Sequence, residues 1–146
     1  MSMTLSHNTG AQYSDLQVGD ELPLLQLPAI NRTTLALYCG ASGDHNPIHV
    51  DIDFARKARM PDVFAHGMLS AAYLGRLLTQ WVPQTQVRSL AVRFTGITQL
   101  AHVPTCSGTI TEKFEENGEK RVRLAIRCAN QYGEEKLLGE AVVALA

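Results

Sequence analysis

The spacing of hydrophobic residues divides the chain into a helical first half and a strand-rich second half. Residues 67–81 are apolar on almost every side, which is typical of a helix that is buried over most of its surface. From residue 86 onward the spacing changes from helical to alternating, as at Leu90, Val92 and Phe94, which share one face of a strand. Three further strands are predicted at residues 105–114, 122–128 and 137–145.

Turn-forming residues separate the predicted strands. Hairpin turns are expected at residues 116–118 and 132–134, each of which contains a glycine. A first strand over residues 21–28 contains Pro23 and Pro28, and prolines favour edge strands because they cannot donate to the ladder. Since the strands follow one another through short connections, we expect an antiparallel sheet. The sequence predicts an α+β domain in which this sheet packs against the long apolar helix.

A shorter helix is predicted before the long one. Asn31 and Thr33 can cap its start, and Gly40 and Gly43 fit its end. A short helical turn is expected over residues 52–59. The segment between these two helices carries most of the candidate chemistry.

The length and composition are those of one globular domain. The chain has 146 residues, of which 45% are hydrophobic and 18% are charged. We assign residues 1–14 to a flexible lead-in and residues 15–146 to the domain. The formal net charge of −1 gives no excess of cations for a nucleic-acid backbone, so nucleic acid is not expected as a partner.

The N-terminal sequence and the cysteines indicate a compartment. Residues 1–12 are polar and lack the basic start and the apolar run of a signal peptide. Cys39, Cys106 and Cys128 are far apart, and neither a disulfide framework nor a zinc site is expected. The longest apolar segment, residues 68–82, is shorter than the ~20 residues that span a bilayer. We therefore expect a cytoplasmic protein that does not enter a membrane.

Titratable side chains are concentrated in residues 38–55, around the run A-S-G-D-H-N-P-I-H. Asp44 and His49 are five positions apart, and on a continuous helix they would point about 140° away from each other. Pro47 lacks a backbone donor and disfavours helical angles at Asn46, so the chain must bend between the two side chains. A carboxylate and an imidazole that face one water are suited to adding that water to a polarised double bond.

The same residues have a structural interpretation. Asp44 and Asn46 would then be turn residues at a capped helix end, and His49 would be partly exposed. A metal site could use His45 and His49, but Pro47 between them breaks the helix that this spacing requires. No metal is therefore expected, and the spacing alone leaves the turn and the acid/base interpretations open.

The run resembles the signature of the MaoC-like R-specific enoyl-CoA hydratases. That signature is an aromatic residue, small residues, G-D-x-N-P-x-H, and a small residue six places on. A second element, A-H-G-M, follows at residues 65–68. The resemblance covers roughly residues 15–146. The matching positions are Tyr38, Ser42, Gly43, Asp44, Asn46, Pro47, His49 and Ala55.

The resemblance implies a hot-dog fold, an antiparallel sheet wrapped around a long central helix. It also implies that Asp44 and His49 activate water and that Asn46 supports them, and we place Ser42 with Asn46. A glycine amide near the start of the central helix would bind the thioester carbonyl. We assign this amide to Gly67, because a residue without a Cβ lets an oxygen approach and the start of a helix has free N–H donors.

His66, next to the assigned amide, has two interpretations. Its side chain lines the pocket and contacts substrate, or it caps the helix and hydrogen-bonds within the core. We assign it to the substrate site and leave the structural interpretation open.

The expected function is that of a lyase. It would reversibly hydrate a trans-2-enoyl-CoA to the (3R)-3-hydroxyacyl-CoA without a cofactor, with CoA present only as part of the substrate, and its stereochemistry is implied by the resemblance alone. The partner is expected to be acyl-CoA, and the chain is expected to form a homodimer or a hetero-oligomer with another hot-dog chain. Two alternatives stay open, a hot-dog acyl-CoA thioesterase and a non-catalytic acyl-thioester-binding subunit.

Overall fold

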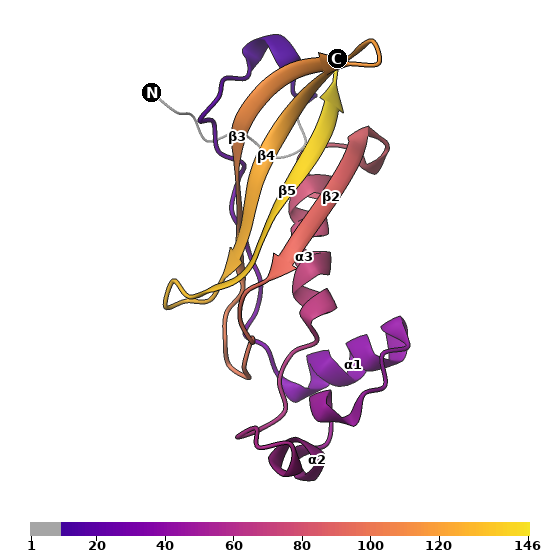
Figure 1. Ribbon diagram of the computed structural model, residues 1–146, viewed down its shortest axis with the longest axis vertical. Coiled ribbons are helices and arrows are strands. Elements are labelled where there is room, and N and C mark those ends of the chain that lie inside the picture. The colour runs from indigo at the N-terminus through magenta and orange to yellow at the C-terminus, as the bar shows by residue number, and fades with distance from the viewer. Residues whose placement is uncertain (1–9) are drawn as a thin grey trace.

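The computed structural model describes residues 10–146 and shows a curled antiparallel sheet beside one long helix (Figure 1). The sheet has five strands in the order β1-β3-β4-β5-β2. This is the hot-dog arrangement, and it confirms the predicted fold class. The strands are β1 Leu25–Gln26, β2 Val87–Phe94, β3 Thr105–Glu116, β4 Glu119–Ala129 and β5 Glu135–Leu145.

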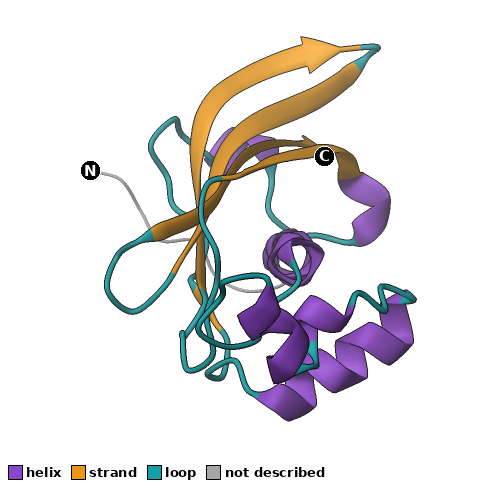
Figure 2. Ribbon diagram, turned by 60° about the horizontal axis from the view of Figure 1, so that its bottom comes forward, coloured by secondary structure: helices purple, strands orange, loops and turns teal. Residues whose placement is uncertain are grey.

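Helix α3, Gly67–Trp81, has the bounds predicted from the sequence and lies within the curl of the sheet (Figure 2). Its residues Leu74 and Leu78 are buried in one hydrophobic cluster with Val122 and Ile126 of the sheet. A second cluster packs its N-terminal turn against the helices of the first half. The helix is therefore apolar on most sides because two clusters cover it. No helix within residues 10–146 has the length and hydropathy needed to cross a membrane.

Two shorter helices precede α3, namely α1 Arg32–Ser42 and α2 Ile52–Lys57. As predicted, Asn31 caps α1, because its side-chain oxygen accepts a 2.8 Å hydrogen bond from the Thr34 N–H. The helix ends at Gly43, whose φ of 75° lies in the left-handed region that favours glycine. Single turns of 3-10 helix occur at Tyr13–Asp15, Pro47–His49 and Gln84–Gln86.

Both predicted hairpin turns are present. The β3–β4 turn has Asn117 and Gly118 at φ values of 52° and 74°, as a two-residue hairpin loop requires. The β4–β5 turn contains Gly133 at φ 77°. These turns set the register that places Val122 and the apolar residues alternating with it on the inner face.

The first edge strand is shorter than expected, and the partner of the second edge strand was not predicted. The sequence predicts a first strand over residues 21–28, and the structure forms only Leu25–Gln26, paired with β3. The sheet is antiparallel as expected, and β2 lies at the edge opposite β1 and pairs with β5 instead of β3, the next strand along the chain. Alternation of residue types defines the two faces of a strand and not its neighbours, so this pairing had no local signal.

Part of the predicted lead-in, residues 1–9, lies outside the described residues. Within the remainder, the Tyr13 N–H donates to the carbonyl oxygen of Ala146 over 3.0 Å. Lys113 Nζ donates to the carbonyl oxygens of Tyr13 and Leu16 over 2.8 and 2.7 Å. These bonds join residues 13–16 to β3 and to the C-terminal end of the sheet.

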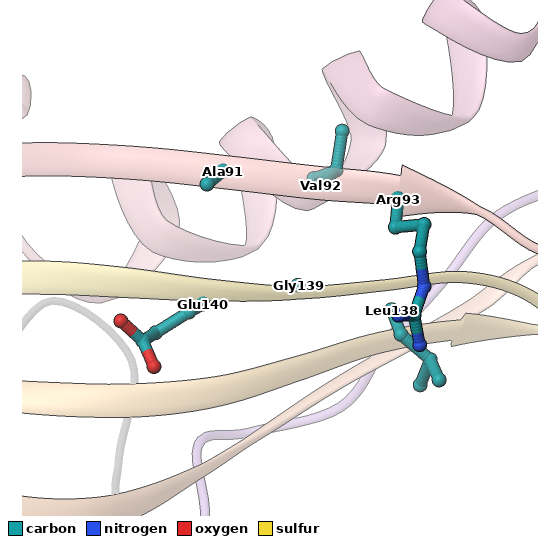
Figure 3. Close-up of a pocket in the computed structure, with 6 residues that line it drawn as sticks. All are labelled: Ala91, Val92, Arg93, Leu138, Gly139 and Glu140. Carbon is teal, nitrogen blue, oxygen red and sulfur yellow. The ribbon is translucent and has the colours of Figure 1, made fainter.

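Gly139 determines how closely β2 approaches β5. It pairs with Val92, and a Cβ at its position would overlap the main-chain oxygen of Ala91. Only a glycine therefore allows this approach. The pair of strands also carries an open depression (Figure 3). The depression is lined by Ala91, Val92, Arg93, Leu138, Gly139 and Glu140.

Replacing Gly139 with alanine should push β2 away from β5. We expect the free energy of unfolding, measured with urea, to fall by about 1–3 kcal/mol, the usual loss from overpacking. The control is Gly40→Ala in α1, where a Cβ meets nothing within 4 Å. That variant should be more stable than the parent by roughly 0.5–1 kcal/mol. A Gly139→Ala protein as stable as the parent would show that the close approach is not required.

Candidate active site

Three side chains shape the loop that follows α1 by accepting hydrogen bonds from main-chain N–H groups two residues ahead. Ser42 Oγ accepts from the Asp44 N–H over 3.1 Å, and Asp44 Oδ1 accepts from the Asn46 N–H over 3.2 Å. Asn46 Oδ1 accepts from the Ile48 N–H over 3.1 Å. Bonds of this kind stabilise turns in place of a helical ladder. Ser42 and Asn46 therefore flank Asp44 along the loop and stabilise its turns, and their supporting role in the reaction stays a prediction.

Pro47 begins a turn of 3-10 helix that carries His49 into the protein. The His49 N–H donates to the Asn46 carbonyl oxygen over 3.2 Å, which closes the turn. His49 is 8% exposed, whereas Asp44 is exposed. The predicted bend is present, and it brings the imidazole inward while the carboxylate stays accessible.

The His49 ring is oriented by the main chain of the segment before α3. Its Nδ1 lies 2.7 Å from the carbonyl oxygen of Phe64. A carbonyl oxygen can only accept, so Nδ1 carries the proton and Nε2 of the neutral ring has a free lone pair. The Phe64 ring packs edge-on against the imidazole, with centroids 5.0 Å apart.

His66 lies against the other face of the site. Its Nε2 is 3.2 Å from the carbonyl oxygen of Asp44, so this nitrogen is the donor. Its ring stacks on that of His49, with centroids 3.9 Å apart and planes 29° apart. The edge of Tyr38 packs at 4.8 Å. Among the described residues, His66 Nδ1 is buried and has no hydrogen-bond partner.

Burial favours the neutral form of His66. It lowers the pKa of this imidazole, and the neighbouring His49 lowers that pKa further, against smaller opposing effects of the Asp44 carbonyl and carboxylate. Burial and, to a lesser extent, the Asp44 carboxylate raise the pKa of Tyr38. The residues around the Asp44 carboxylate thus include an uncharged phenol and an uncharged imidazole near neutral pH.

The carboxylate and both imidazoles meet in one place. One oxygen of Asp44, one ring nitrogen of His49 and one ring nitrogen of His66 all lie within 4.8 Å of one another. Two hydrogen bonds of about 2.8 Å to one water at a tetrahedral angle put their partner atoms roughly 4.6 Å apart. The 4.8 Å limit is therefore compatible with one water that contacts both Asp44 and His49.

Two imidazoles and a carboxylate are also a common set of ligands for transition metals. Here His66 Nε2 is bonded to the Asp44 carbonyl oxygen, and its Nδ1 is buried. A cation could reach only Asp44 and His49 without rearranging the loop. That the site holds no metal stays a prediction.

Gly67 is the first residue of α3 and follows His66 directly. His66 is the N-cap residue and makes no side-chain capping bond, and the Leu69 N–H donates to its carbonyl oxygen over 3.1 Å. A Cβ at Gly67 would lie 2.9 Å from the ring of Phe94 in β2. A side chain at this position would have to displace the half-exposed Phe94 ring, and the Gly67 amide directly follows His66 of the histidine cluster.

Sequence reasoning missed two residues of this site. The Phe64 main chain orients His49, and the Phe94 ring packs on Gly67. Neither has a local signal, because one acts through a carbonyl and the other comes from a strand 27 positions from the glycine. None of the residues that line the depression in Figure 3 is a predicted site residue.

The chain is similar to MaoC-like proteins in sequence and in structure. The MaoC like domain family matches residues 16–125. An (R)-specific enoyl-CoA hydratase from Rhodospirillum rubrum is 27% identical over 133 residues, which cover 90% of this chain and 89% of that protein. The unliganded R-hydratase PhaJ1 from Pseudomonas aeruginosa superposes with a TM-score of 0.82 at 30% identity, covering 96% of this chain and 89% of that one.

A similar segment occurs in a much larger protein. The fatty acid synthase subunit beta of Saccharomyces cerevisiae is 29% identical over 129 residues, which are 81% of this chain but 6% of that subunit. The chain thus spans a small part of the length of the synthase subunit that it matches.

The burial of His66 predicts a dependence of stability on pH. Its pKa is below the ordinary value of 6.5, so the unfolded chain binds a proton at this residue at a higher pH than the folded chain does. The free energy of unfolding should therefore fall as the pH drops through about 6.5, and it should fall less steeply in His66→Phe. Urea titrations at several pH values measure these slopes. His45→Gln, at an exposed imidazole, is the control, and equal slopes in the parent and His66→Phe would contradict the prediction.

Proposed function

The chain belongs to the MaoC-like domain family, and on that premise we propose that it is a hydro-lyase acting on acyl thioesters. It adds water reversibly to a trans-2-enoyl-CoA and forms the (3R)-3-hydroxyacyl-CoA. One observation carries this proposal: Asp44 and His49 have ligand atoms within 4.8 Å of each other, a limit compatible with one shared water. The acting unit is residues 15–146.

Proton transfer in the proposed reaction begins at His49. Its Nε2 is free to accept because Nδ1 donates to Phe64. The water, held between Nε2 and the Asp44 carboxylate, loses a proton to this pair as its oxygen bonds to C3 of the substrate. The electrons of the double bond move toward the thioester. The acid/base pair, His49 and Asp44, then returns a proton to C2. The sum of the steps is one added water.

The negative charge that develops during the reaction falls on the thioester oxygen. In this proposal the amide of Gly67, the first residue of α3, donates to that oxygen. Such an interaction is stronger in the enolate-like transition state than in the substrate, so it lowers the barrier. The proposed chemistry moves protons only, and it needs no cofactor besides the CoA that carries the substrate.

Removing either half of the acid/base pair should abolish most of the activity. We expect Asp44→Asn and His49→Gln to lower kcat by about 10² to 10⁴-fold, because a positioned acid or base contributes that much. Loss of the conjugated absorbance of crotonyl-CoA measures the rate. His45→Gln, which removes the exposed imidazole between them, should keep the parent rate within about twofold. A folded Asp44→Asn protein with the parent rate would refute the assignment.

A thiol assay run beside the absorbance assay separates the alternative functions. A thioesterase would release free CoA, which a thiol-reactive dye detects, and a binding subunit would produce neither signal. The exposed carboxylate next to a lone pair on His49 favours hydration over simple binding, since a binder needs no acid/base pair.

A second copy of the chain is the partner that the β2 edge favours. Within the described residues β2 pairs with β5 alone, so its other edge has free N–H and C=O groups. Its inner-face residues Leu90 and Phe94 are 41% and 51% exposed, and Met68 of α3 is 58% exposed. We propose that β2 pairs with β2 of a second copy, which would cover this apolar strip. A different hot-dog chain could occupy the same edge.

A charge on the inner face of β2 should weaken this dimer. We expect Leu90→Lys to move the protein from dimer to monomer in sedimentation velocity runs, because pairing would bury the ammonium group. Ser89→Lys places the same charge on the opposite face of the same strand and should leave the dimer intact. A parent protein that sediments as a monomer at micromolar concentration would refute the pairing.

A further inference from the structure

His66 contacts both members of the proposed acid/base pair. Its Nε2–H donates to the main chain of Asp44, and its ring face stacks on His49. It also directly precedes Gly67, the proposed oxyanion donor. His66 is thus next to all three proposed catalytic groups. It contacts Asp44 in the loop and His49 in the 3-10 turn, and it precedes Gly67 at the start of the helix.

The His66 side chain is not placed to touch the substrate. It is 1% exposed, and its second ring nitrogen is buried without a partner among the described residues. Any effect that it has on the reaction must pass through the residues that it contacts.

Stability does not explain a histidine at this position. A buried acceptor without a hydrogen bond is unfavourable, and a phenylalanine ring would fill similar space with no unpaired nitrogen. The stack on His49 and the edge contact with Tyr38 need only an aromatic ring. The feature that the histidine adds to a phenylalanine-sized ring is an N–H aimed at the Asp44 carbonyl oxygen.

We propose that His66 is a positioning residue of the hydration site, which holds the Asp44 main chain with Nε2–H and the His49 ring with its face. This inference rests on the proposed function. The ring acts in its neutral form. When His49 takes a proton from water, an uncharged ring at 3.9 Å adds no repulsion, whereas a charged one would oppose the transfer. Burial, which lowers the pKa of His66, favours that neutral form.

Two substitutions separate the hydrogen bond from the ring. His66→Phe keeps an aromatic face and loses the donor, and His66→Gln keeps an N–H near the position of Nε2 and loses the ring. We expect His66→Phe to lower kcat by about 10 to 100-fold, since a displacement of about 1 Å in a site has effects of this size. KM should stay within roughly threefold of the parent value, because the side chain does not bind substrate. The melting temperature should equal or exceed that of the parent.

His66→Gln provides the rescue. It should recover at least about a fifth of the parent kcat, because the main-chain contact at Asp44 is restored. His45→Gln, at the exposed neighbouring histidine, controls for the loss of an imidazole from this part of the chain.

Several results would overturn the proposal. They are a His66→Phe protein with the parent kcat, one that raises KM while kcat is unchanged, and one that does not fold or melts well below the parent. A His66→Gln protein no better than His66→Phe would do the same. If the parent itself does not hydrate enoyl-CoA, the proposed function fails, and that outcome is distinct from a failure at His66 alone.

Discussion

Two hydrogen bonds from histidine rings to main-chain carbonyls fix the site, and they cross between the same two segments. His49, in the loop after α1, donates to Phe64 in the segment before α3. His66, in that segment, donates to Asp44 in the loop. Because each ring is held by the chain opposite, neither segment can shift without breaking a bond of the other. The distance between the Asp44 carboxylate and the His49 imidazole, on which the proposed chemistry depends, is set by this reciprocal pair of hydrogen bonds.

These bonds also select the tautomer of each neutral histidine ring. Each carbonyl oxygen selects one tautomer, so His49 keeps a lone pair on Nε2 and His66 keeps one on Nδ1. The two lone pairs are not equivalent, because that of His66 is buried and has no partner in the described chain. His49 and His66 are thus stacked imidazoles whose free ring nitrogens have different surroundings. One is available to a water, and the other acts only on the protein.

Much of the fold was predictable from the sequence. Within the site, the proposed acid/base side chains were predictable, but the main-chain groups that orient them were not. The bounds of α3 and the turn at Asn117 follow from local patterns of apolar residues and glycine. The bend at Pro47 correctly placed His49 near Asp44, since a proline acts on its own backbone. The partner of β2 and the acceptor of His49 could not be predicted. Both depend on contacts between segments that are distant along the chain. Every residue has a main-chain carbonyl, so the residue type does not show which one accepts the hydrogen bond.

The position of β2 connects the site to the proposed dimer. Its residue Phe94 packs against Gly67, so the strand that forms one edge of the sheet also forms one wall beside the helix start. Phe94 remains half exposed in the single chain. A second copy paired along this edge would cover that ring and restrict its movement. The approach of a thioester oxygen to the Gly67 amide would then depend on dimer formation, because the ring that limits the space beside the amide would be held by the partner. Loss of the dimer should on this argument affect the oxyanion contact before it affects Asp44 and His49, which are held by bonds within one chain.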